Sequence, residues 1–336
     1  MRSSALIPVL VVAAFVAATG SAIAAPPAPD PGSVGVRLLD VPTVARDDPR
    51  ARQYIVDHLA PGSVINRRIE VSNTTREPMS VAVYPAAALI EEGSFLGADG
   101  HTANELSSWT ALSSSTLELA PTAEAAVTVT ISVPPDAAPG EQYGAVWAEV
   151  RAPGDEGVVL VNRVGIRMYL SVGDGNAPAS DFTVDSLTAA RDPHGRPLVT
   201  AQLRNTGGRA LDLSGTLDLT GGPGALTAGP FPVQTGSTVA PGQAATVSVA
   251  MDRQLPDGPW DAALTLRSGM LEENVEARIQ FPAAPGTATP AAAEQAGGWG
   301  VGILVGALIL LVVLLLVVLV VVLRRRRPEA VGPEPR

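Results

Sequence analysis

The sequence has no cysteine and no lysine, and aromatic residues make up only 4% of its 336 residues. Without cysteine the chain has no disulfide framework and no thiol nucleophile. Without lysine it has no amine nucleophile on a side chain, and all 23 basic residues are arginine. An arginine-only set of cations is typical of GC-rich codon usage, which predicts a bacterial, actinobacterial source.

Catalytic and metal-binding motifs are missing as well. His58, His101 and His194 are far apart in the sequence and show no HxH or HExxH spacing. No G-x-S-x-G motif and no phosphate-cradling glycine pattern occurs. We therefore expect no enzyme activity, no cofactor and no metal. The alternative is a hydrolase whose site assembles only on folding, for which Glu91–Glu92 with Asp99 is a carboxylate candidate, although this segment reads more simply as a solvated hairpin loop.

Apolar runs are confined to the two ends of the chain. Residues 6–18 follow Arg2 and precede the small-x-small pattern Ala22–Ala24, so residues 1–24 are interpreted as a cleaved signal peptide, with an uncleaved anchor as the alternative. Residues 301–323 are long enough to span a bilayer and are followed at once by four arginines.

This arrangement predicts a membrane helix over 299–323 and a basic cytoplasmic tail over 324–336. A Pro/Ala/Gly-rich stretch at 283–298 is interpreted as a linker that holds the exported part off the membrane. The expected location is the cell membrane, with one span, the N-terminus outside and the exported part facing the cell wall.

The exported part is strongly acidic. Residues 26–300 contain 17 arginines against 31 acidic residues, which gives a net charge of about −14. Such a surface argues against nucleic acid and against anionic lipid headgroups as partners. It is compatible with a neutral glycan, with a basic partner or with solubility alone.

The pattern between the ends has a period of two, which is typical of half-buried strands. Apolar residues alternate with polar or small ones in several runs bounded by Gly, Pro, Asn and Asp, namely 127–133, 164–172, 211–219, 260–266 and 275–281. No amphipathic helix of useful length occurs, apart from a short turn near 101–109. The spacing predicts an all-β fold of the sandwich type.

A weak internal repeat divides this region. A strand that ends in Asn-Thr occurs at Asn73–Thr74 and again at Asn205–Thr206, and similar turn signals follow each in the same order. The repeat predicts two tandem immunoglobulin-like β-sandwich domains, at 34–172 and 179–282, ahead of the single C-terminal transmembrane helix. The boundary is a polar, glycine-bearing segment at 173–178.

Several stretches of the first domain occur in an order that resembles a known family. They are Tyr54–Gly62, Arg68–Thr75, Gly93–Gly100 and Pro134–Val146. Residues 34–172 resemble the peptidoglycan-binding domain of the WxL-interacting proteins, which are surface proteins of Gram-positive bacteria. The resemblance implies a wall-facing adaptor whose first domain holds peptidoglycan and whose second holds another surface component. The second domain matches only as a generic sandwich.

Two groups of residues are candidates for ligand binding. The charged segment 46–54 contains Arg50, Arg52 and Tyr54, whose guanidinium groups and ring suit peptide carboxylates and sugar faces. The alternative for this segment is a solvated loop.

The second group follows Tyr143 on a predicted strand. Trp147, Glu149 and Arg151 share the face opposite Val146, and the tryptophan ring could stack on a sugar. The alternative is that Trp147 covers the sandwich core.

Taken together, the sequence predicts a non-enzymatic, membrane-anchored cell-surface protein that binds the cell envelope. The expected ligand is peptidoglycan or another cell-wall glycan, and a secreted or surface protein is a further expected partner. The alternatives are an adhesin, or an accessory subunit of an envelope membrane complex, that does not bind peptidoglycan.

Overall fold

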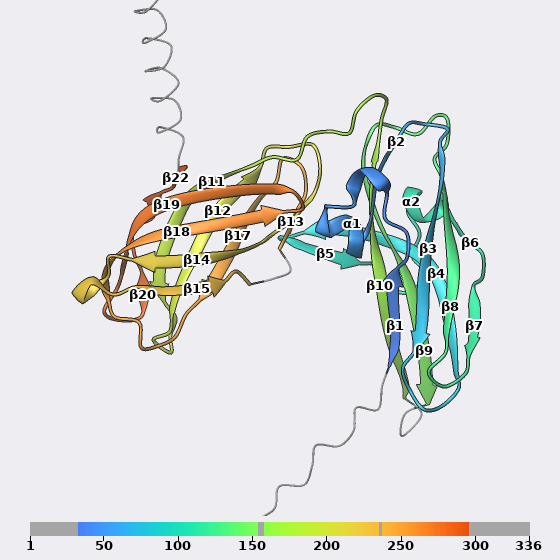
Figure 1. Ribbon diagram of the computed structural model, residues 1–336, viewed down its shortest axis with the longest axis horizontal. Coiled ribbons are helices and arrows are strands. Elements are labelled where there is room, and N and C mark those ends of the chain that lie inside the picture. The colour runs from blue at the N-terminus through green and yellow to red at the C-terminus, as the bar shows by residue number, and fades with distance from the viewer. Residues whose placement is uncertain (1–32, 154–157, 235–236, 296–336) are drawn as a thin grey trace, which may run out of the picture.

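The computed structural model describes residues 33–153, 158–234 and 237–295 (Figure 1). The predicted signal peptide, membrane helix and cytoplasmic tail lie outside the described residues. Within the described part, no helix combines the length and the apolar character that crossing a membrane requires. These residues form an all-β structure, which confirms the fold class predicted from the period-two runs.

The first half of the structure, residues 34–172, consists of two sheets packed face to face and is called the N-terminal sandwich below. One sheet has the strand order β1-β3-β8-β6 and the other β2-β10-β9-β4-β5, with β7 also paired to β4. The strands are β1 (Val34–Leu38), β2 (Ile55–Leu59), β3 (Val64–Asn73), β4 (Met79–Glu91), β5 (Ser94–Gly97), β6 (Thr110–Leu112), β7 (Thr116–Leu119), β8 (Glu124–Ser132), β9 (Gly140–Pro153) and β10 (Val159–Val172). The helices are a 3-10 turn at Thr43–Ala45, α1 (Pro49–Gln53) and α2 (Glu105–Ser108).

The core of the N-terminal sandwich follows the predicted alternation. Alternate residues of β8, from Val127 to Ile131, and of β10, from Ile166 to Val172, are buried together between the sheets. The other face of β10 is not solvated, however, because Tyr169 and Ser171 are buried as well. The period-two pattern predicts a half-buried strand here, and the second half of the molecule covers the remaining face.

The second half, residues 182–295, is called the C-terminal sandwich. Its sheets have the orders β17-β12-β11-β20, with β21 on β11, and β15-β14-β18-β19-β22, beside a separate pair β13-β16. The strands are β11 (Phe182–Arg191), β12 (Pro197–Asn205), β13 (Leu211–Asp212), β14 (Ser214–Thr220), β15 (Ala228–Pro232), β16 (Thr238–Val239), β17 (Ala244–Ala250), β18 (Gly258–Ser268), β19 (Leu271–Phe281), β20 (Gly286–Thr287), β21 (Ala291–Ala292) and β22 (Glu294–Gln295), with a 3-10 turn at Pro223–Ala225. Trp260 and the alternate residues of β14, β18 and β19 form its buried core.

The repeated Asn-Thr motif has one structural role in both halves. Asn73 ends β3 and Asn205 ends β12, and both side chains are buried. The Asn73 amide donates to the carbonyl oxygens of Leu119 and Ala120, at 3.3 and 3.1 Å. The Asn205 amide donates to the carbonyl oxygen of Val239 at 2.9 Å. Each asparagine therefore ties the end of its strand to a distant turn.

The predicted linker 283–298 is described as far as Gln295, and that part pairs with the C-terminal sandwich. β20 and β21 pair with β11, whereas β22 pairs with β19 in the other sheet. Small side chains let the chain lie close, since Ala288, Ala291 and Ala293 pack against the core. Residues 286–295 thus bridge the two sheets along one side of the sandwich.

Candidate functional site

The two sandwiches meet at a polar and aromatic contact, which is called the junction here. On the N-terminal side, the short helix α1 presents Arg50, which is only 8% exposed. The helix begins at Pro49, and the Asp48 side chain caps it by accepting from the Arg50 backbone N–H at 2.8 Å. On the C-terminal side, β13 and β16 face α1 and β5 (Figure 1).

Asp212 of β13 is the common acceptor of the junction. Its carboxylate accepts from Arg50 Nε, from the Tyr169 hydroxyl and from the Thr238 hydroxyl, each at 2.8 Å. Arg167 Nη1 lies 3.3 Å from the same carboxylate. Because three of these donors belong to the N-terminal sandwich, one carboxylate holds the two halves together.

Aromatic rings surround this ion-pair network. Tyr169 lies at the centre, with the ring centroids of Tyr54, Phe95 and Tyr143 at 5.7, 5.3 and 6.0 Å. The Arg50 guanidinium lies 4.8 Å from the Tyr169 centroid. Burial raises the pKa of the Tyr169 hydroxyl above its ordinary value, so this group stays protonated and donates to Asp212.

A second hydrogen-bonded link crosses the junction at Glu141. Its Oε2 accepts from the Ala210 backbone N–H at 2.6 Å and from the Tyr143 hydroxyl at 2.8 Å. Burial raises the pKa of Glu141 above its ordinary 4.5, and the two hydrogen bonds only partly oppose this effect. The folded protein therefore holds a proton on this carboxyl at pH values where the unfolded chain releases it.

This pKa shift predicts a pH dependence of stability. For an acid whose pKa is raised by folding, the stabilising difference is fully present below pH 4.5 and is lost as the pH rises through the folded-state pKa. We expect Glu141→Gln, which keeps an acceptor oxygen without a charge, to remove this loss. In guanidinium unfolding of residues 26–298 from pH 4 to pH 8, the variant should gain stability relative to wild type as the pH rises. A constant difference across that range would contradict the assignment.

A cleft of about 430 Å³ opens beside this network. It is lined by side chains from both sandwiches, namely Pro49, Arg50, Gln53, Tyr54, Arg167, Asp212, Leu213, Ser214 and Ser237, together with Gly269. Its charged groups are two guanidinium groups and one carboxylate. The cleft therefore carries one excess positive charge within an otherwise acidic part of the chain, residues 26–300, and this charge favours an anionic group in a ligand.

The structure places the sequence-predicted residues either at or near the junction or on the outer face of one sheet. Arg50, Tyr54 and Tyr143 come together at the junction. Arg52 lies beside them on α1 but is exposed, and its Nε donates to the Arg46 carbonyl at 2.9 Å. Arg167 and Asp212, which complete the junction, did not stand out in the sequence. The nearest signal was their place as polar residues in alternating runs.

Trp147, Glu149 and Arg151 lie on the outer face of the β2-β10-β9-β4-β5 sheet. Val146 and Ala148 point into the core, so the predicted alternation of faces is confirmed. The Trp147 ring packs closely on Gly97 and Gly165, and the Arg163 guanidinium lies 4.5 Å from its centroid. A sugar could stack on this ring only after Arg163 moves aside.

The other two residues of this outer face are also engaged. Glu149 is buried and accepts from the Tyr84 hydroxyl and from Arg151 Nε, which holds its pKa below the ordinary value. The Tyr84 ring stacks on His101 with centroids 3.7 Å apart. This face is a packed polar cluster in which each of these side chains already has a partner.

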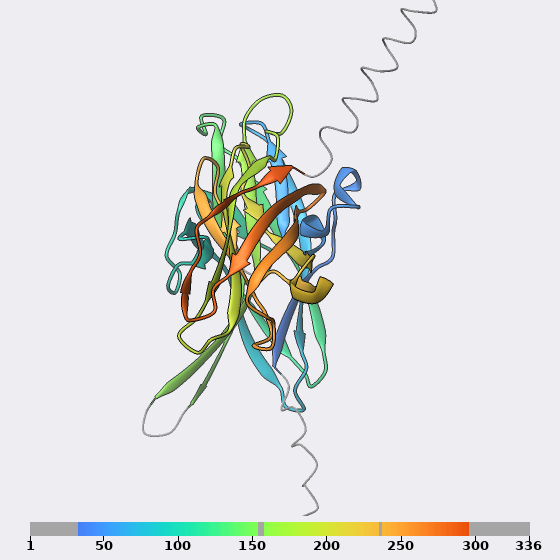
Figure 2. The ribbon, with the colours of Figure 1, turned by 90° about the vertical axis from the view of Figure 1, so that its left-hand side faces the viewer.

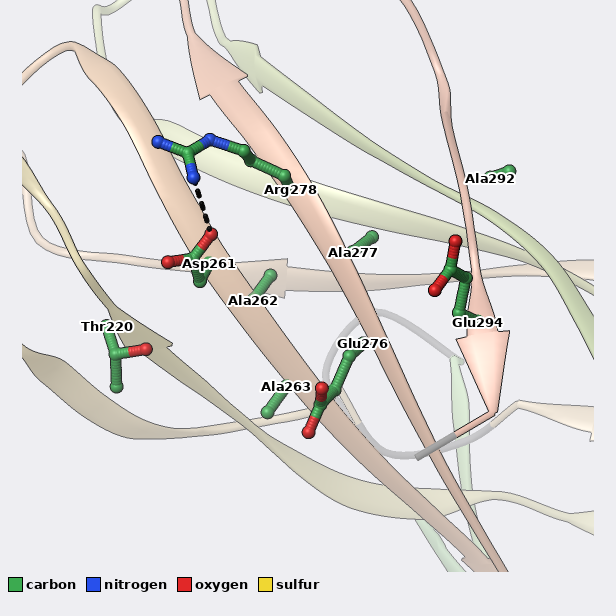
Figure 3. Close-up of a pocket in the computed structure, with 9 residues that line it drawn as sticks. All are labelled: Thr220, Asp261, Ala262, Ala263, Glu276, Ala277, Arg278, Ala292 and Glu294. Carbon is green, nitrogen blue, oxygen red and sulfur yellow. Dashed lines mark ion pairs between the residues drawn. The ribbon is translucent and has the colours of Figure 1, made fainter. Parts of the chain in front are cut away.

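A second groove, of about 390 Å³, lies on the C-terminal sandwich (Figure 3). Alanines of β18, β19 and β21 form its floor, and Arg278 pairs with Asp261 at 3.5 Å. Glu276 and Glu294 add two unbalanced carboxylates at its side. Its charge is therefore opposite to that of the junction cleft, and an anionic ligand would be repelled here.

Within the described residues, no three His, Asp or Glu side chains gather as a metal site would require. No family model matches the chain, and no curated protein does. Solved structures with some similarity include bacterial chaperones and complexes of chaperones with pilin or adhesion subunits. The Escherichia coli chaperone DraB is 13% identical, with 78% of this chain and 98% of that chain covered and a TM-score of 0.38.

Two further similar structures are complexes. A chain of the Salmonella enterica SafA pilin–SafB chaperone complex is 12% identical, with 79% and 97% coverage and a TM-score of 0.39. A chain of the Acinetobacter baumannii CsuC–CsuE chaperone–tip adhesion subunit complex is 15% identical, with 68% and 96% coverage and a TM-score of 0.35. At these values the likeness does not extend to function.

Proposed function

We propose that this chain is a non-enzymatic, membrane-anchored surface protein that binds cell-wall peptidoglycan in the junction cleft. In this proposal residues 1–24 direct export, two immunoglobulin-like domains form the exported part, and the helix at 299–323 spans the membrane once. The N-terminus is outside and the sandwiches face the wall. The cleft, with its excess positive charge, is the observation that carries the proposal.

The chemistry of the cleft suits a wall fragment, which combines sugars with a peptide that bears carboxylates. Arg167, whose side chain is 30% exposed, offers a guanidinium group for a carboxylate, and the buried Arg50 adds positive charge behind it. Tyr54 offers a ring edge, and Ser214 and Ser237 offer hydroxyl groups for sugar hydroxyls. An acidic surface outside the cleft would exclude other polyanions while the cleft itself accepts one anionic group.

The family resemblance also favours the junction as the binding site. Of the stretches that resemble the WxL-interacting proteins, three reach the junction. Tyr54 begins the first, Phe95 belongs to the third and Tyr143 belongs to the fourth, and all three rings pack against Tyr169. Of these three rings, Tyr54 lines the cleft, whereas Phe95 and Tyr143 pack against Tyr169 beside it.

Sedimentation with purified peptidoglycan sacculi tests the proposal. We expect residues 26–298 to co-sediment at physiological salt and Arg167→Gln to weaken binding by about tenfold, because one charge-assisted contact is lost. Arg278→Gln is the matched control, since it removes an exposed arginine from the other groove. Circular dichroism of each variant checks folding.

Each other outcome has a defined meaning. If wild type is not retained above background, peptidoglycan is not the ligand and the adhesin or accessory-subunit alternative replaces it. If Arg167→Gln and Arg278→Gln sediment equally with wild type, the ligand does not occupy the junction cleft. Release of muropeptides during the incubation would show that the protein is an enzyme.

A further inference from the structure

One edge of the N-terminal sandwich is open along part of β10. Residues 159–172 of β10 pair with β9 on one side. On the other side only residues 168–172 are paired, in parallel, with β2. Among the described residues no strand pairs with that side of 159–167. Backbone groups of alternate residues point to opposite sides of a strand, so four or five of these nine residues direct their N–H and C=O groups toward this edge.

This open edge is also apolar. Val158, Val159, Leu160 and Val161 are consecutive, and each is between 51% and 60% exposed. They account for four of the nine large apolar side chains that are exposed in the described part of the chain. Proteins commonly protect an open edge with charged side chains, proline or a covering element. β1 contacts β10, but residues 158–162 remain exposed and include no charged residue and no proline.

The nearby arginines do not protect the edge either. Arg151 of β9 is bound to Glu149 at 2.7 Å. Arg163 donates to the Ala98 carbonyl at 3.2 Å and lies over the Trp147 ring. Both cations are therefore engaged on the outer sheet face. An incoming strand would meet apolar side chains and free backbone groups.

The open edge belongs to a hairpin that projects from the rest of the molecule. Figure 2 shows the β9–β10 hairpin extending past the neighbouring strands. In Figure 1 the end of β9 and the start of β10 lie at the opposite end of the molecule from β22, the last described strand before the predicted span. With the proposed anchoring, this hairpin projects away from the cell's own membrane.

We propose that the β10 edge, residues 159–167, binds an extended segment of another exported protein as an added strand. β2 already occupies the continuation of the same edge, so an incoming strand would extend an existing pairing. The segment should carry apolar side chains at alternate positions. These would pack beside Val159 and Val161 on one face of the sheet, or beside Leu160 on the other face.

The choice of occupant rests on the proposed anchoring. A membrane is disfavoured because the hairpin projects away from it. A second copy is disfavoured because two identical edges pair antiparallel about a two-fold axis, whereas two copies anchored in one membrane would present parallel β10 strands. A separate protein can reach the edge away from the membrane and can pair with it in either strand direction.

The test is selection from a displayed library of random peptides, about nine to twelve residues long, against the full chain in lipid nanodiscs. We expect enriched peptides with apolar residues at alternate positions, whose binding falls by at least about tenfold in Leu160→Lys. Leu226→Lys is the matched control, because Leu226 is exposed elsewhere. Hydrogen exchange should slow at the backbone amides of residues 159–167 when the peptide binds.

Failure here is distinct from failure of the sacculus assay, since Leu160→Lys changes no residue that lines the cleft and Arg167→Gln changes none of the exposed residues 158–162. The proposal is overturned if no peptide is enriched, or if enriched peptides bind Leu160→Lys as well as wild type. It is also overturned in favour of a second copy if the wild-type chain is dimeric and Leu160→Lys is monomeric. Empty nanodiscs control for peptide binding to lipid.

Discussion

Asp212→Ala is expected to lower the free energy of unfolding of residues 26–298 by about 3–5 kcal/mol. The substitution leaves Arg50 as an unpaired charge that is only 8% exposed, and removing one partner of a buried pair costs this much. Tyr169 and Thr238 lose their acceptor as well. Guanidinium unfolding followed by tryptophan fluorescence measures the change.

The junction itself should open in this variant. The backbone amides of Ala210 and Thr238 both donate across the junction, to Glu141 and to the Gly93 carbonyl, and their hydrogen exchange should become faster. Asp261→Ala is the matched control, because it breaks an exposed ion pair worth less than about 1 kcal/mol. An Asp212→Ala protein as stable as the Asp261→Ala protein would show that the carboxylate does not couple the halves.

The second large effect concerns the buried asparagines. We expect Asn205→Ala to destabilise the protein by about 2–3 kcal/mol, because the buried Val239 carbonyl and the Arg209 carbonyl lose their donor. The Gly207 backbone N–H loses its acceptor at the same time. Equilibrium unfolding in guanidinium at constant pH gives the difference.

Asn274→Ala provides the comparison for this variant. Asn274 lies in the same sandwich, is exposed and bonds only to neighbouring side chains, so its loss should change stability by no more than about 0.5 kcal/mol. Asn73→Ala should behave like Asn205→Ala, since the motif has the same role in both halves. If the Asn205→Ala and Asn274→Ala proteins were equally stable, the buried hydrogen bonds of Asn205 would not have the stabilising role assigned to them.

Much of the fold could be predicted from local patterns. Alternation in β8, β14, β18 and β19 predicts the faces that the structure buries, because one sheet face must leave water. The short turn expected near 101–109 is α2. The repeated Asn-Thr motif predicts two equivalent strand ends, and buried side-chain amides explain why asparagine is needed there.

The junction could not be predicted in the same way. Asp212 reads as an ordinary polar residue between Leu211 and Leu213, yet its partner Arg50 is 162 residues away. Only the packing of one half on the other brings them together. The alternation of apolar and polar residues along a strand does not indicate which distant residues will meet. The same packing buries Tyr169 on the strand face that alternation assigns to solvent.

The strand pairing of segment 286–295 could not be predicted for a different reason. Its Ala, Gly, Pro and Thr composition is typical of a linker, and its strands are only two residues long. Pairing with β11 and β19 comes from neighbouring edges that are already formed. Intrinsic strand preference plays little part in such a case.

The central claim is that the junction cleft binds an anionic wall fragment. Calorimetric titration of residues 26–298 with a soluble disaccharide-peptide, and with the same compound whose carboxylates are amidated, tests it most directly. We expect the acidic form to bind, and we expect the affinity to be lower by about tenfold or more for the amidated form and for Arg167→Gln. Equal affinity for both forms, or no heat of binding with either, would contradict it.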